Sequence, residues 1–333
     1  MGASRRTVLP QMPRGVSRAR EDRRICPIVI YPFAHPRDTS HLRSLYTRLS
    51  ELCSAPDSKY FRPLTVLNRQ TVDRVTTSNM SPAEANFASR EFEKFLKDHV
   101  EAQSEIERTW SVDTCQMWLT GLGKAADRKH EDVLSAIYWV IPGDFAYDST
   151  EGRKALSKIH EIPMVVFDNQ EVDLALGEIQ VPLNSAKQLI DTYGTYGLLY
   201  NWFPSEAQGI RDITAKPRTE FFAISHSYLK HVLSQRWYAY EQMIVILLHA
   251  MDGKRRARQI RKIDLGSITD DDVGRSRLEG AMQQVERTER VLKLFWRDRH
   301  GGDKDWRDDF RRLDMQSEKV RAAAMIIFEQ VLG

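Results

Sequence analysis

The sequence predicts an α/β protein with an open, mostly parallel sheet and a C-terminal helical extension. Short apolar runs rich in β-branched residues alternate with amphipathic helical patterns over residues 25–170. This alternation is typical of a parallel sheet covered by helices. Beyond Ser276 the apolar spacing is helical throughout. We therefore expect three regions: a basic tail over residues 1–24, an α/β domain over residues 25–265 and the helical extension over residues 266–333.

The composition is that of a soluble globular protein. Of the 333 residues, 41% are hydrophobic and 29% are charged, which is too apolar for a disordered chain. The longest apolar stretch falls well short of the roughly 20 residues that cross a bilayer, so no transmembrane segment is expected. A net charge of +3 gives no reason to expect a nucleic-acid partner. Three scattered cysteines, Cys26, Cys53 and Cys115, cannot form a disulfide framework, which favours a reducing, cytoplasmic compartment.

The first 24 residues have a composition that cannot bury a core. They contain seven arginines and only two acids, Glu21 and Asp22. We expect a disordered basic tail, and a targeting segment remains the alternative.

Two strands and two helices are expected in the first third of the chain. Residues 26–33 form a short apolar run that Pro32 ends, typical of a buried parallel strand, and residues 63–67 are a second candidate. Thr39 or Ser40 can cap the first helix, and Ser81 with Pro82 begins the second. The apolar faces of these helices carry Leu42, Leu45, Tyr46 and Leu49, and Phe87, Phe92, Phe95, Leu96 and Val100.

The remaining elements follow the same alternation. Residues 115–126 are expected to be helical, residues 135–141 form the best candidate for a central strand, and residues 162–167 form another strand candidate. Residues 243–251 predict an apolar helix. Two helices separated by glycines 301 and 302 complete the extension, with apolar stripes at Leu278, Met282, Val285, Leu292 and Phe295, and at Trp306, Phe310, Leu313 and Val320.

A carboxylate follows the predicted central strand directly. Ligands of open α/β sheets bind at the carboxyl ends of strands, where Asp144, with Asp148 nearby, could ligate a divalent cation that neutralises a diphosphate. A turn in which Asp144 caps the next helix is the alternative.

The stretch over residues 177–204 mixes aromatic residues, glycines and amides. Gly194, Thr195, Asn201 and Trp202 could line a sugar site, because sugars present apolar CH faces together with hydroxyl groups. The same aromatic residues could instead form the core beneath a long loop.

Two glutamates precede apolar segments. Glu220 follows Arg218, a candidate substrate-binding residue, and Glu241 opens the helix of residues 243–251. A helix N-terminus keeps a carboxylate ionised, which suits a base that takes a hydroxyl proton, although a cap without a catalytic role fits equally. The basic run over residues 254–258 is either a solvated face or a contact for phosphates or lipid headgroups at a membrane surface.

The order of these motifs resembles a GT-A nucleotide-sugar glycosyltransferase, of a family 2-like type, over residues 25–265. The resemblance rests on Gly121, Leu122, Ala125, Gly143-Asp144, Gly177, Gly194-Thr195, the residues 201–204, the residues 220–224 and Tyr240-Glu241-Gln242. It implies a Rossmann-type sheet, an enzyme that transfers a sugar from a nucleotide-diphosphate donor to an acceptor hydroxyl by single displacement, and a divalent Mn or Mg cofactor.

The same resemblance implies roles for individual residues. Pro32, His35 and Asp38 would line the nucleotide pocket, and Asp144 would hold the metal and diphosphate. Glu241 would deprotonate the acceptor, with Glu220 in reserve. One departure stands out. Where the family usually has an Asp-x-Asp triplet, this sequence has Gly143-Asp144-Phe145-Ala146, in which Asp144 is the single acid in register.

Two other functions remain open from the sequence. A non-catalytic sugar- or effector-binding module would have a similar α/β core. A nucleotidyltransferase would share Asp144 but need more acids near it to hold two metals.

Overall fold

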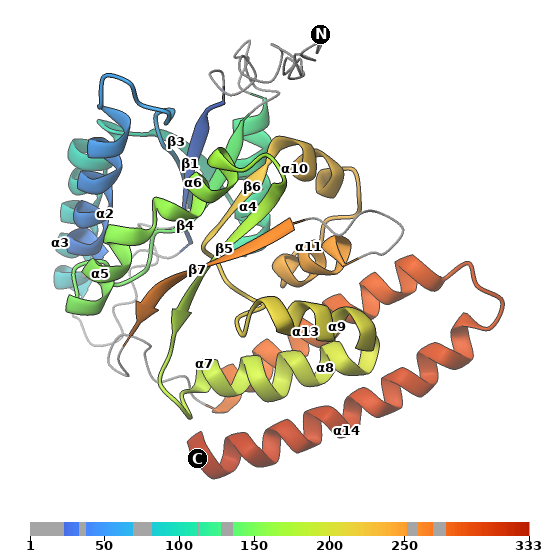
Figure 1. The fold of residues 1–333 in the computed structure, drawn as a ribbon. Helices are drawn as coiled ribbons and strands as arrows, with labels where there is room; N and C mark the ends of the chain where they lie inside the picture. Colours follow the sequence, from blue (N-terminus) through green and yellow to red (C-terminus); the bar gives the residue numbers. More distant parts are fainter. Residues whose placement is uncertain are drawn as a thin grey trace, which may run out of the picture.

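A computed structural model describes residues 23–32, 38–68, 82–111, 113–127, 136–251, 259–268 and 278–332. Its centre is a seven-stranded sheet in the order β3-β2-β1-β4-β6-β5-β7 (Figure 1). Every neighbouring pair is parallel except those of β6, which runs antiparallel to both β4 and β5. The predicted class, an α/β fold with a mostly parallel open sheet, is confirmed. The strands are β1 Ile25–Tyr31, β2 Leu64–Asn68, β3 Glu105–Thr109, β4 Ile137–Pro142, β5 Val172–Gln180, β6 Phe222–Ser225 and β7 Gln259–Ser267.

Helices cover both faces of the sheet. One apolar cluster contains residues of α2, α3, α5 and α6 together with one face of the strands. A second contains residues of α4, α8 to α11, α13 and α14 together with the other face. The helices are α2 Asp38–Cys53, α3 Pro82–Phe95, α4 Thr114–Ala126, α5 Thr150–Lys158, α6 Glu161–Asp168, α7 Ala186–Leu189, α8 Tyr196–Trp202, α9 Pro204–Ile213, α10 His226–Leu233, α11 Gln242–Ala250, α13 Leu278–His300 and α14 Trp306–Leu332, with π-helical η1 Leu96–Glu101 and η3 Ile190–Thr195.

Most predicted elements are present. The strands expected at residues 26–33, 63–67 and 135–141 are β1, β2 and β4, and β4 is central, between β1 and β6. All four residues of the expected apolar face of α2 are buried. Phe87 in α3 is instead 68% exposed, so the expected stripe of that helix begins at Phe92. Ser81, the expected cap, lies outside the described residues.

The prediction of a strand at residues 162–167 is wrong. These residues form α6, in which Ile162 and Val166, four positions apart, both face the core. Pro163 lies in the first turn, where a helix needs no N–H donor. A short apolar run fits a buried strand or a buried helix equally, so periodicity could not decide.

The C-terminal helices share the second apolar cluster with the sheet. Val285 and Phe295 of α13 and Phe328 of α14 belong to the same cluster as the β1 residues Cys26 and Ile28. The sequence ahead of Arg23, which holds nearly all of the expected tail, lies outside the described residues, as does the basic run over 254–258. Arg23 itself is ordered, and its Nη1 donates to the carbonyl oxygens of Val166 and Phe167. Among the described residues, no helix is long and apolar enough to span a membrane.

Candidate active site

A cavity of about 610 Å³ lies at the edge of the sheet where β4 and β5 end. Because β6 runs antiparallel to both strands, its first residue, Phe222, pairs with Val140 of β4 and Leu176 of β5. Glu220, two residues before Phe222, therefore reaches the same edge as Asp144, two residues after β4. The topology thus brings together two carboxylates that are 76 residues apart in the sequence, and both line the cavity.

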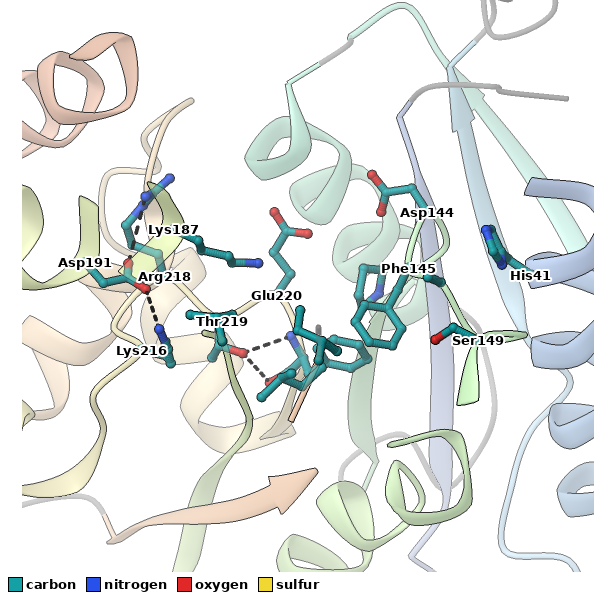
Figure 2. A pocket seen from close by; sticks show the side chains of 16 residues that line it. His41, Asp144, Phe145, Ser149, Lys187, Asp191, Lys216, Arg218, Thr219 and Glu220 are labelled. Carbon is teal, nitrogen blue, oxygen red and sulfur yellow. Dashed lines mark hydrogen bonds and ion pairs between the residues drawn. The ribbon is translucent and has the colours of Figure 1, made fainter. Parts of the chain in front are cut away.

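The walls of this cavity differ in charge. Asp144 and His41 lie on one side, and Lys187, Lys216 and Arg218 lie on the other (Figure 2). The Glu220 side chain projects between the two walls (Figure 2). A ligand that bridges the cavity would meet cations on one wall and a carboxylate on the other.

The turn that carries Asp144 is held by backbone and side-chain contacts. The Gly143 amide donates to the Ile30 oxygen at 2.7 Å, and the Tyr147 hydroxyl donates to the Pro142 oxygen at 2.6 Å. Gly152 in α5 packs so closely that a Cβ there would lie 1.8 Å from the Ala146 oxygen. The position of Asp144 is therefore fixed by β1 and α5 as well as by its own strand.

The Asp148 carboxylate binds two residues of α2. Ser40 Oγ donates to its Oδ2 at 2.5 Å, and His41 Nδ1 pairs with its Oδ1. Asp148 thus anchors the start of α2, and the residues that line the cavity do not include it. Among the described residues no group of three His, Cys, Asp or Glu side chains could hold a metal. Mg²⁺ in phosphate sites needs only one or two protein carboxylates because substrate phosphates complete its coordination shell. The single carboxylate of Asp144 would be enough for such an arrangement.

A buried acid organises the cationic wall. Asp191 of η3 is 3% exposed, and its Oδ2 lies 3.4 Å from Lys216 Nζ. Burial raises the pKa of the Asp191 carboxyl, whereas Arg218 and Lys216 lower it. Lys187 forms no ion pair with any described residue, and its side chain is exposed to the cavity. Its ammonium group is accordingly available to an anionic ligand.

Glu241 is bound to Arg218 in a two-point ion pair. Arg218 Nε donates to Glu241 Oε2 at 2.8 Å, and Nη2 donates to Oε1 at 3.1 Å. Nη2 also donates to Gln284 Oε1 of α13. Glu241 has a left-handed backbone with φ 53°, and its side chain forms no capping hydrogen bond with α11. Both carboxylate oxygens of Glu241, the expected proton acceptor, are thus bound by Arg218.

Glu220 lies in a different environment. Its side chain is exposed at the cavity. Desolvation raises the pKa of the Glu220 carboxyl, Lys187 and Arg218 lower it, and the neighbouring Glu241 carboxylate raises it. An accessible carboxyl with a raised pKa suits a proton acceptor.

Four residues expected at a sugar site have packing contacts instead. Gly194 faces Val285, where an added Cβ would lie 2.5 Å from Cγ2, and Thr195 is fully buried. Asn201 Nδ2 donates to Ser317 Oγ and to the Leu313 oxygen, each at 2.9 Å. Trp202 Nε1 donates to Ser317 Oγ at 2.8 Å. These residues join η3 and α8 to the C-terminal helices and do not line the cavity.

The expected nucleotide pocket is described only in part. Pro32 is buried just after β1. His35 lies outside the described residues, and Asp38 begins α2 without a described side chain. Arg218 lines the cavity.

Several cavity residues carry no signal in the sequence. Lys187, Asp191 and Lys216 are isolated charges in irregular or short helical segments. The pairing of β5 with β6 brings these three charges together, and β5 was not predicted. Gln284, which accepts from Arg218 but does not line this cavity, lies on a helix 66 residues after Arg218.

No family model and no curated protein matches the chain. Solved structures do show similarity. Glucosyl-3-phosphoglycerate synthase from Mycobacterium tuberculosis in complex with UDP is 12% identical with a TM-score of 0.48, over 86% of each chain. A mycobacterial protein is 12% identical with a TM-score of 0.49, over 85% of this chain and 79% of that one. The same synthase with Mn²⁺, UDP-glucose and phosphoglyceric acid is 11% identical with a TM-score of 0.46, over 84% of this chain and 86% of that one.

Proposed function

We propose that this protein transfers a sugar from a nucleoside-diphosphate sugar to an acceptor hydroxyl. The observation that carries the proposal is the position of Glu220 between a cationic wall and Asp144, in one cavity at the carboxyl edge of the sheet. A diphosphate needs charge neutralisation as it departs, and a hydroxyl nucleophile needs a base. Both groups are available in this cavity.

The donor diphosphate binds against the cationic wall. Lys187 contributes the cation without a partner among the described residues, and Arg218, held by Glu241 and Gln284, contributes a guanidinium in a fixed orientation. A divalent cation, when bound at Asp144, supplies further neutralisation of the diphosphate charge.

Glu220 removes the acceptor proton. The acceptor oxygen then forms a bond to the anomeric carbon, while the bond from that carbon to the diphosphate oxygen breaks and its electron pair leaves with the diphosphate. The raised pKa of Glu220 makes it a stronger base than an ordinary glutamate. Glu241 acts through Arg218 as a positioning residue.

Paired glutamine variants test these roles. For Glu220→Gln we expect turnover of a nucleotide sugar to fall by roughly 10²- to 10⁴-fold, with nearly unchanged affinity for the nucleoside diphosphate. For Glu241→Gln we expect mainly a higher donor KM, because Arg218 loses its partner. Asp144→Asn should remove the Mn²⁺-dependent part of nucleotide binding measured by calorimetry.

The opposite pattern would reassign the roles of the two glutamates. If Glu241→Gln abolishes turnover and Glu220→Gln retains it, the base is Glu241. If a panel of uridine, guanosine, adenosine, cytidine and thymidine diphosphate sugars binds but none is turned over with any acceptor or water, the chain is a non-catalytic sugar-nucleotide-binding module.

A further inference from the structure

A second cavity of about 280 Å³ lies on the far side of Glu220 and Arg218, which line both cavities. Its other walls come from the start of α4, the segment before α11, and α13. The lining residues there are Asp113, Thr114, Cys115, Trp118, Tyr240, Glu241, Met243, Gln284 and Arg287. A compound bound in this second cavity would be separated from the first cavity only by the proposed base and its arginine neighbour.

The charge of the second cavity disfavours an anion. Three carboxylates, those of Asp113, Glu220 and Glu241, line it with two guanidinium groups, those of Arg218 and Arg287. Arg287 lies over the Tyr240 ring at 5.2 Å from its centroid. A phosphate or carboxylate entering here would meet an excess of negative charge.

The helix N-terminus in this cavity is also occupied. Such an N-terminus attracts anions through its exposed amides. At the start of α4, however, Asp113 Oδ1 already accepts from the amides of Cys115 and Gln116, at 3.0 and 3.3 Å. The amides of this first turn are thus neutralised by a carboxylate of the protein.

The uncharged lining suits a compound rich in hydroxyl groups. Trp118 and Tyr240 provide aromatic surface, and Thr114 and Gln284 provide a hydroxyl and an amide. Aromatic rings pack against the CH faces of sugars, and polar groups orient their hydroxyls. The volume equals that of about nine water molecules in the liquid, which is enough for one sugar ring and too small for a chain of several.

We propose that the second cavity binds an uncharged sugar or polyol and presents one of its hydroxyls to Glu220. This inference rests on the proposed function for the role of the bound compound as acceptor. The binding of a neutral sugar or polyol does not depend on that function, because it is predicted from the residues that line the cavity.

Binding without turnover gives the first test. Saturation-transfer NMR on the full chain would compare methyl glucoside and glycerol with glucose 6-phosphate and glycerol 3-phosphate, each with the first cavity saturated by the tightest-binding nucleoside diphosphate, so that its cationic wall is occupied. The two neutral compounds are also measured without nucleotide. We expect signals from the neutral compounds and none from their phosphorylated counterparts. Stronger binding of the phosphorylated compounds, or binding of neither class, overturns the proposal.

Three variants assign any binding to this cavity. Tyr240→Ala should weaken methyl glucoside about 3- to 10-fold, whereas Tyr193→Ala, an exposed tyrosine outside both cavities, should leave it unchanged. Asp113→Asn keeps an oxygen for the α4 amides while removing a charge, so it should admit glucose 6-phosphate. Equal effects of the two tyrosine variants overturn the assignment. If nucleotides fail to bind while sugars bind as described, the proposed function fails and this inference stands.

Discussion

Replacing Ser317 by alanine distinguishes packing from substrate binding for Asn201 and Trp202. Ser317 is fully buried and accepts from Trp202 Nε1 at 2.8 Å and from Asn201 Nδ2 at 2.9 Å. Asn201 keeps the Leu313 oxygen as a second acceptor, so the main loss falls on the buried indole N–H. A buried donor without a partner costs about 1–3 kcal/mol. At about 2–4 °C per kcal/mol, Tm should fall by roughly 2–12 °C.

Calorimetric unfolding measures this change, and titration with nucleoside diphosphates shows whether the site is affected. We expect Ser317→Ala to lower Tm and leave nucleotide affinity unchanged. The control is Ser205→Ala, an exposed serine in α9, which should change stability by less than about 0.5 kcal/mol. An unchanged Tm together with weakened nucleotide or sugar binding would refute the reasoning and would indicate that Asn201 and Trp202 belong to the sugar site.

Three further outcomes are expected. Lys187→Gln should weaken nucleoside-diphosphate binding by about 10- to 100-fold, the range of a charge-assisted hydrogen bond; a change below twofold in calorimetry contradicts its role. Because the pKa of Glu220 is raised, the ionised carboxylate destabilises the fold as pH rises through that pKa. Glu220→Gln should therefore raise Tm relative to the parent protein at pH 8 and not at pH 4, and a pH-independent difference contradicts this sign. Gly152→Ala should lower Tm, since an added Cβ has no space there. Gly123→Ala, where an added Cβ meets nothing within 4 Å, should be tolerated. Equal Tm values for the two variants would show that the turn before α5 moves to accommodate the methyl group.

The strands with strong local patterns were predictable from the sequence. The β-branched runs of β1 and β4 are buried on both faces, and such strands leave near-continuous apolar runs. Edge strands leave weaker patterns. The β3 sequence EIERT contains one apolar residue, and β7 is mostly half-buried or exposed, so neither was predicted.

The candidate site was predictable only in its parts. Asp144 was found because it follows a strong strand, and Arg218, Glu220 and Glu241 because charges precede apolar segments. Their arrangement depends on the antiparallel direction of β6, a tertiary property that four residues cannot encode locally. For that reason the sequence could name both glutamates and could not decide which of them is paired with Arg218.

The C-terminal extension has a consequence for how this protein would lose activity. Gln284 of α13 holds Arg218, and Val285 next to it packs on η3, which carries Asp191. A local opening of α13, of the kind that hydrogen exchange detects, would release the cationic wall while the sheet stayed folded. On warming, turnover should then decline before the far-ultraviolet signal of the sheet does. The extension is in this sense a structural part of the candidate site, and it could not be exchanged as an independent module.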